Sequence, residues 1–198
     1  MSNKVKFGLK SLFIASVTEA ANGEITFGTP RSWPGSVSLT MDPQGDTNAF
    51  YADDCKYYVT TSNDGYEVSL ETALVPDWFT EEYLGETKDT DGNLVEQTTD
   101  SPSHFAALFE FTGDKKAIRH CLFYCQAARP TVEGETKGES AEVKTESISF
   151  TSMALPGTNI IKKKSPEETD ATKYANWYTA VTTPEFTPVG IPQEGDGE

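Results

Sequence analysis

The sequence is poor in the residues that most often carry catalysis or bind metals, with two histidines and three cysteines among 198 residues. His104 and His120 have no second ligand or nucleophile motif near them in the sequence, which favours strand residues at the margin of a core. Cys121 and Cys125 would lie about 13 Å apart along an extended strand, too far for a disulfide or for one shared zinc ion. We therefore expect reduced, partly buried thiols and no bound metal.

Catalytic motifs are also missing. The sequence contains no phosphate-binding glycine loop, no Gly-x-Ser-x-Gly and no His-Glu-x-x-His. Residues 89–93 resemble a calcium loop only in part, because Leu94 stands where that loop requires glycine, so an exposed turn is the better interpretation. Asp53 and Asp54 are adjacent, and adjacent strand residues point to opposite faces, which makes them unsuited to acid-base catalysis on one substrate. The sequence predicts neither an enzyme nor a cofactor.

Long apolar runs and basic charge are scarce as well. No segment has the apolar length that spans a bilayer, and the N-terminal residues lack the pattern of a signal peptide, so we expect no membrane association and a cytoplasmic location before assembly. There are 16 Lys and Arg against 31 Asp and Glu, a formal net charge of -15. Wrapping around the outside of a nucleic acid relies on basic residues and is disfavoured, whereas a surface that repels phosphate fits this charge.

Apolar and polar residues alternate with a period of two through much of the chain, which is typical of half-buried β-strands. The run from Pro34 to Gly85 shows the pattern most clearly. Its apolar positions on one face are Val37, Leu39 and Met41 in one segment and Tyr66, Val68, Leu70 and Leu74 in another. The fold class that follows is mainly β.

The same run contains turn and helix signals. Asn63-Asp64-Gly65 is a tight-turn sequence, which predicts a hairpin joining the strand 57–61 to the strand 66–74. Asp77 is expected to cap a short helix that Gly85 ends, with Trp78, Phe79 and Tyr83 offering apolar surface to a sheet. Between the first two strands, residues 42–54 are interpreted as a long loop.

Further strands are expected on both sides of this run. The predicted segments are 5–17, a short strand at 25–27, the strand 105–111 turning at 112–115 into 117–127, and a strand around Ile148 and Phe150 near a sheet edge. Residues 133–144 and the lysine run 162–164 are interpreted as exposed loops. Tyr174, Trp177, Tyr178 and Val181 form an apolar patch expected to dock. One domain is predicted over residues 1–182, followed by an acidic, disordered tail at 183–198.

Several motifs in order resemble the major tail proteins of long-tailed phages that infect Gram-positive bacteria, and more narrowly the phi13-type group. The resemblance runs from about Lys4 to Pro184, and its most specific parts are residues 34–78 and 104–130. Its motifs are KVKFGLK, PGSVSLTMDPQGDTNAFYADDCKYY, SNDGYEVSLETALVPDWF, HFAALFEF, RHCLFYCQAARP and KYANWYTAV.

The resemblance implies a tail tube subunit with a β-sandwich or barrel core, one flanking helix, and extended loops or arms. It implies hexameric rings of this chain that stack into a hollow tube, through which DNA passes without specific binding. The implied partners are other copies of the chain, the tape measure protein, the tail terminator and distal tail proteins. The implied location is the virion tail, with the host cytoplasm before assembly. No catalytic residue is implied.

Residues 42–54 are the predicted assembly loop. Phe50 and Tyr51 provide apolar anchors, and Asp53 and Asp54 lie beside them, so these four are candidates for contacts with another subunit. Trp177 and Tyr178 are candidates in a terminal arm that becomes ordered on assembly. Carboxylates carried by hairpins are expected to face the lumen and to repel the DNA backbone, although no single residue is assigned.

Two alternative functions remain open. One is a tail terminator or neck protein that caps a ring without polymerising. The other is a monomeric β-sandwich that binds carbohydrate through Trp33, Trp78 or Trp177. A hydrolase is not supported, because no catalytic constellation is found.

Overall fold

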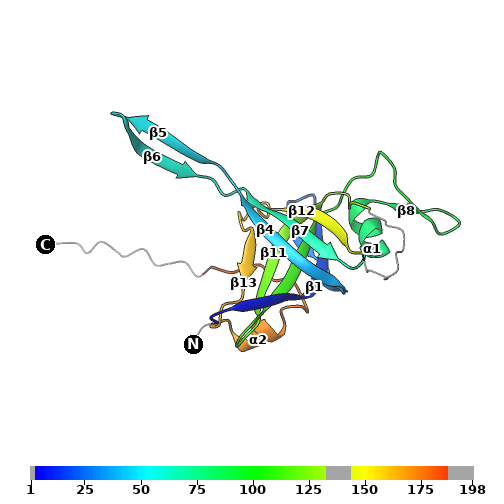
Figure 1. Cartoon of the computed structure of the whole chain (residues 1–198). Coiled ribbons are helices and arrows are strands. Elements are labelled where there is room, and N and C mark those ends of the chain that lie inside the picture. The colour runs from blue at the N-terminus through cyan, green and yellow to red at the C-terminus, as the bar shows by residue number, and fades with distance from the viewer. Residues whose placement is uncertain (1–2, 133–143, 187–198) are drawn as a thin grey trace, which may run out of the picture.

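The computed structural model describes residues 3–132 and 144–186, and their architecture is mainly β (Figure 1). The predicted loop 133–144, apart from Lys144, and the predicted tail from residue 187 onward lie outside the described residues. The strands are β1 (Lys6–Glu19), β2 (Ile25–Phe27), β3 (Arg31–Trp33), β4 (Ser36–Gln44), β5 (Thr47–Ala52), β6 (Cys55–Thr61), β7 (Gly65–Thr72), β8 (Thr87–Lys88), β9 (Leu94–Val95), β10 (Phe105–Gly113), β11 (Ile118–Ala127), β12 (Glu146–Met153) and β13 (Lys162–Lys164). The helices are α1 (Asp77–Phe79), the π-helix η1 (Thr80–Leu84) and α2 (Ala171–Ala175).

Nine of the described strands form one antiparallel sheet in the order β2-β1-β10-β11-β12-β7-β4, with β3 added to β1 and β13 added to β11. The predicted hairpin of residues 105–111 and 117–127 is confirmed as β10 and β11. The strand around Ile148 and Phe150 is confirmed as β12, but its predicted edge position is wrong. It lies between β11 and β7, where its backbone pairs on both sides.

The sheet has a hydrophobic core on each face. The first core contains Phe105, Ala107 and Phe109 of β10 and lies under α1 and η1. The second core contains Ala106 and Leu108, the residues between them, and lies under the C-terminal segment. Because successive residues of a strand point to opposite faces, the apolar run 105–109 of β10 serves both cores.

The helix after the sheet strand β7 differs in detail from its prediction. Phe79 and Tyr83 pack in the first core as expected, and Gly85 ends the π-helix in the left-handed conformation with φ of 89°. Asp77, however, does not cap α1: Pro76 occupies the N-cap position without a side-chain hydrogen bond, and Asp77 is the first helical residue. The helical turn packs through aromatic contacts of Phe79 with Trp33 and of Phe79 and Tyr83 with Phe105.

The predicted alternation is confirmed at Leu39, Met41, Val68 and Leu70, which contact the first core. Two positions of that pattern are wrong. A β-bulge at the start of β4 leaves Val37 52% exposed. Leu74 lies beyond the end of β7 and is 61% exposed, while Thr72 fills the buried position and accepts a hydrogen bond from the Trp33 indole at 3.1 Å.

The lysine run 162–164 forms strand β13 and not the predicted loop. Its backbone pairs with His120, Cys121 and Leu122 of β11. The Lys162 ammonium lies 4.0 Å from the Tyr66 ring centroid, and the Lys163 ammonium lies 4.8 Å from the Trp177 ring centroid. Long lysine stems can cover apolar surface while the charge stays near water, which explains how three lysines fit one strand.

Candidate assembly interface

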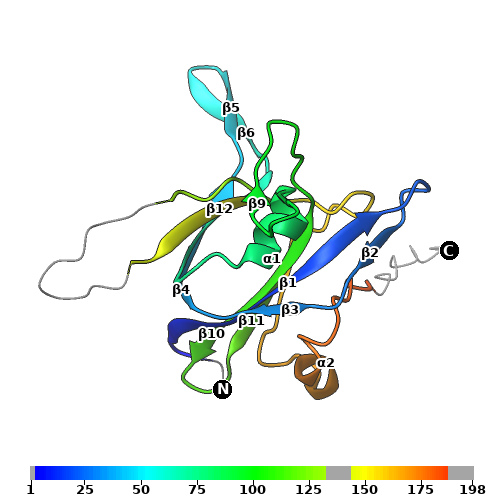
Figure 2. The same ribbon diagram turned by 90° about the vertical axis from the view of Figure 1, so that its right-hand side faces the viewer.

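Strands β5 and β6 form an arm that projects from the sheet (Figure 1, Figure 2). They pair with each other and not with the nine-stranded sheet, in a register that joins Thr47 to Thr61 and Phe50 to Tyr58. The predicted hairpin of strands 57–61 and 66–74 is therefore wrong. Residues 57–61 belong to β6 of the arm, and β7 pairs with β4 and β12. We use "the arm" for residues 46–63.

The arm continues the β4–β7 ladder beyond the edge of the body. Two backbone hydrogen bonds join its base, from Ser62 N to the Asp46 carbonyl and from Asp64 N to the Gln44 carbonyl, each 2.9 Å. The chain bends at Gly45, where φ is 150° and an added Cβ would lie 2.3 Å from the Ser62 carbonyl oxygen. Only glycine fits this close approach of two backbones. The turn predicted at Asn63–Gly65 is thus the junction between arm and sheet.

The predicted assembly loop 42–54 is β-structured, because it comprises the end of β4, all of β5 and the turn at the tip of the arm. Phe50 and Tyr51 lie on β5 and are 62% and 60% exposed. Asp53 and Asp54 form the turn, with φ of 51° and 56°. Two successive left-handed residues are the geometry of a type I′ hairpin turn. The structure thus brings all four predicted residues into one arm.

Three more exposed apolar residues of the arm were missed by the sequence-based prediction. Tyr57, Tyr58 and Val59 of β6 are 72%, 62% and 49% exposed. The sequence-based prediction places them in a hairpin with the strand 66–74. The Tyr-Tyr-Val run itself could have identified them. A strand with one solvated face alternates apolar and polar residues, and three successive apolar residues indicate that both faces are covered.

Trp177 and Tyr178 occupy a different place, packed on the second core of their own chain. Trp177 is 8% exposed and donates from Nε1 to the His120 carbonyl at 3.4 Å. Tyr178 stacks on Phe13 with 4.6 Å between ring centroids and donates to Glu110 at 3.1 Å. Burial raises the pKa of the Tyr178 phenol, so the hydroxyl stays a donor. In the described chain, both side chains thus pack against their own subunit.

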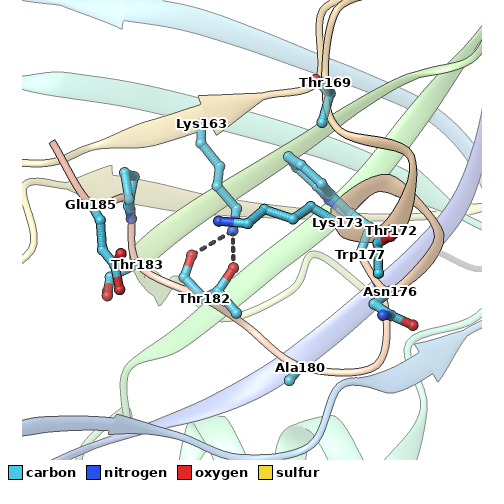
Figure 3. Close-up of a pocket in the computed structure, with 11 residues that line it drawn as sticks. Lys163, Thr169, Thr172, Lys173, Asn176, Trp177, Ala180, Thr182, Thr183 and Glu185 are labelled. Carbon is cyan, nitrogen blue, oxygen red and sulfur yellow. Dashed lines mark hydrogen bonds between the residues drawn. The ribbon is translucent and has the colours of Figure 1, made fainter. Parts of the chain in front are cut away.

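A cavity of about 470 Å³ lies beside this C-terminal segment (Figure 3). Lys163 and Lys173 line it, together with Thr182 and part of Trp177. The Lys163 ammonium donates to the Thr182 carbonyl and, at 2.9 Å, to the Thr182 hydroxyl. Burial lowers the pKa of Lys163. These contacts hold the segment around Thr182 against β13.

The prediction of buried thiols is confirmed, and His120 is a strand residue as expected, whereas His104 precedes β10 and is not part of a strand. Cys121 and Cys125 are buried free thiols, and burial raises the pKa of Cys121 to about 12. His120 is a half-buried strand residue with a pKa lowered to about 4 by burial and by nearby lysines. Across residues 3–132 and 144–186, no three His, Cys, Asp or Glu side chains gather as a metal site. None of the described helices has the length and apolarity to cross a membrane.

Sequence comparison assigns the family. The profile described as "Phage tail tube protein", that of the lactococcal phage major structural protein, matches residues 1–185. The chain belongs to the phage tail tube protein family, and it is a structural component of the phage tail that self-assembles into tubes and not an enzyme. No curated protein matches the chain.

Two solved structures are similar at low identity. One is the anti-feeding prophage cap, a tube-terminating cap, with 9% identity over 78% of this chain and 87% of that chain and a TM-score of 0.48. The other is the sheath–tube complex of an extracellular contractile injection system in its extended state, with 10% identity over 78% of this chain and 88% of that chain and a TM-score of 0.46.

Proposed function

We propose that this tail tube protein is the major tail protein of a long-tailed phage of the phi13-type group. Copies of the chain form hexameric rings, and stacked rings form the hollow tube through which DNA leaves the virion. The observation that carries the proposal is the arm, which projects from the body (Figure 1) and carries exposed aromatic side chains. Exposed apolar surface of this kind marks an interaction site, and a family that builds tubes supplies further copies of the chain to cover it.

One face of β4, β7 and β12 supports the assignment of a lumen. Asp42 lies directly opposite Glu67, and both carboxylates are exposed. Like charges directly opposite each other destabilise a sheet, so their presence points to a functional use. Glu71 lies four residues further along β7 on the same face, and hydrogen bonds from Thr145 and Ser38 lower its pKa.

The rest of that face carries hydroxyl groups. Strands β4, β7 and β12 contain no lysine or arginine. The residues between the carboxylates are Ser38, Thr40, Ser69, Ser147, Ser149 and Thr151. Arg129 borders this face, where it is paired with Glu96. A polyanion is repelled by the carboxylates and finds no cation on the three strands themselves, so DNA slides past without specific binding. We propose that this face lines the tube.

The tube has further partners in this proposal. The tape measure protein fills the lumen before DNA, a terminator closes one end, and distal tail proteins start the other. A role as terminator or neck protein is the second candidate, since such a subunit also forms a ring. A carbohydrate-binding module loses its support, because Trp33 is 2% exposed and Trp177 is 8% exposed, which leaves no aromatic platform at these positions.

Negative-stain electron microscopy of the concentrated, purified protein tests the proposal. Long hollow tubes are the expected result. Single rings that do not elongate would favour the terminator or neck protein. Monomers at every concentration would contradict the proposed function.

A further inference from the structure

We propose that each arm is clamped between two other copies of the chain, with one copy against each of its faces. This inference rests on the proposed function as a tube subunit and specifies how the arm is used. An arm that lay on one neighbour would join two subunits. An arm held on both faces joins three, and it couples neighbouring contacts of the tube to one another.

The register of the arm assigns its side chains to two faces. Phe50 and Tyr58 are directly opposite each other and share one face, which we call face A. Ala49 and Val59 are the next opposed pair, so they lie on the other face, called face B. A register shift follows Phe50, and Tyr51 pairs with Lys56, which leaves Tyr57 as the extra residue on β6. Along β5 itself Tyr51 follows Phe50, so it belongs to face B.

Both faces expose large apolar side chains. On face A, Phe50 and Tyr58 are each 62% exposed. On face B, Tyr51 is 60% exposed and Val59 is 49% exposed. A β-ribbon that covers one surface has one apolar face and one polar face, as the period of two dictates. Polar residues occur on both faces, with Asn48 and Thr60 on face A and Lys56 opposite Tyr51 on face B, but neither face is polar throughout. Contact on one side alone would leave aromatic side chains in water.

The arm also needs outside support to keep its shape. Every residue of β5 and β6 except Ala52 is exposed, and an isolated two-stranded hairpin is marginally stable in water. Its tip differs from its shaft, because Asp53 and Asp54 form the turn and burial of unpaired carboxylates is costly. This distribution fits a shaft enclosed by protein and a tip that reaches solvent on the far side.

The body of the chain offers apolar surface that can receive an arm. Exposed apolar side chains occur on strands or strand ends outside the arm, namely Val5, Phe7, Val37 and Leu74. In the proposed clamp, a second copy of the chain covers face A of the arm and a third copy covers face B. Aromatic side chains commonly dominate the binding energy of such interfaces.

Photo-cross-linking in assembled tubes tests the clamp. The cross-linker p-benzoylphenylalanine replaces both Tyr51 and Tyr58, which lie on opposite faces of the arm. These subunits are mixed with a large excess of unmodified chain, so that each modified arm meets only unmodified copies. Tubes are then collected, irradiated and separated on a denaturing gel.

The expected product of this pair is a covalent trimer, one modified chain joined to two unmodified chains. The matched control replaces Phe50 and Tyr58, both on face A, and is expected to stop at a dimer. A product from Tyr51 and Tyr58 that also stops at a dimer would overturn the clamp while leaving tube formation intact. Failure of the unmodified chain to form tubes would instead refute the proposed function, and the clamp with it.

Discussion

Arg119 on β11 lies directly opposite Glu110 on β10, and its Nε donates to the Glu110 carboxylate at 3.0 Å. The side chains are 17% and 9% exposed, so this ion pair is largely removed from water. The Arg119 guanidinium also lies 3.9 Å from the Tyr174 ring centroid and 4.8 Å from that of Tyr178. The pair therefore connects the sheet to the C-terminal segment that covers the second core.

Removing one partner of this pair should destabilise the protein strongly. Arg119→Met leaves the Glu110 carboxylate buried without its cation, and the expected loss is about 3–5 kcal/mol in the free energy of unfolding. Urea denaturation measures it. The matched control is Arg129→Met, which removes the pair Arg129–Glu96 with side chains 62% and 52% exposed and should change stability by less than about 1 kcal/mol. Equal effects of the two substitutions would contradict this interpretation.

His120 should make stability depend on pH in the acidic range. Burial, with Lys162, Lys164 and Lys6 adding to it, lowers the pKa of His120 from 6.5 to about 4 in the folded protein. The unfolded chain therefore binds more protons between these pH values, so stability is fully present above pH 6.5 and falls as the pH drops toward 4.

The variant His120→Gln removes this contribution. The loss of stability between pH 7 and pH 4 should become smaller by about 1–3 kcal/mol in the variant, after allowance for solvent screening. Urea denaturation at a series of pH values gives the two slopes. Parallel slopes for the unmodified protein and the variant would show that His120 does not titrate as inferred.

Charge reversal on the proposed lumen face should hinder DNA release without preventing assembly. Asp42→Lys with Glu67→Lys places cations where the phosphate backbone passes, so DNA ejection from purified virions should be slower. Asp91→Lys with Glu24→Lys introduces the same change of charge on exposed turns elsewhere and is the control. Ejection rates that are equal in the two double variants would argue against a lumen at β4, β7 and β12.

Salt should promote assembly, because subunits of net charge -15 repel one another until counterions screen them. Light scattering of purified subunit at increasing sodium chloride concentration should show faster and more extensive polymerisation. Slower polymerisation at high salt would mean that attraction between opposite charges dominates the interface.

The strands of the sheet were predicted correctly where apolar and polar residues alternate according to the face that is buried. Phe105, Ala107 and Phe109 share one face of β10 as expected, and β10 turns into β11 at the predicted position. Family resemblance, read from the same residues, led to the tail tube assignment that the family profile confirms. Local patterns and the order of motifs were sufficient for these conclusions.

Strand pairing was harder to predict, because it depends on contacts distant in sequence. Asn63-Asp64-Gly65 has the composition of a tight turn, yet Asp64 bonds to Gln44 and the chain enters the sheet there. The edge assignment of β12 failed for the same reason, since no local signal reports that β7 pairs beside it. Residues 162–164 were predicted to be a solvated loop because all three are lysines. They form a strand, and the side chain of Lys162 lies over the Tyr66 ring.

The candidate interface was predicted in part. Phe50 and Tyr51 were found from their place among acids and glycine, and the structure shows both exposed on the arm. Tyr57 and Tyr58 were missed, because an apolar run indicates a buried core strand when the chain is considered alone. Interface residues and core residues are of the same apolar types. Only the exposure of a residue in the single folded chain distinguishes the two.

The arm is the central element of this account, and its removal tests the account most directly. A variant in which an Asn-Gly turn replaces residues 46–63 keeps the nine-stranded sheet, because the arm pairs only with itself above its base. Its unfolding midpoint should stay close to that of the full chain. Phe50→Ser with Tyr51→Ser is the milder variant, with both side chains exposed in the free subunit.

Electron microscopy of these variants under conditions in which the unmodified chain forms tubes is the decisive measurement. The arm-deleted protein should remain folded and unassembled, and the double serine variant should form few or short tubes. Tubes of normal number and length from the arm-deleted protein would contradict the account.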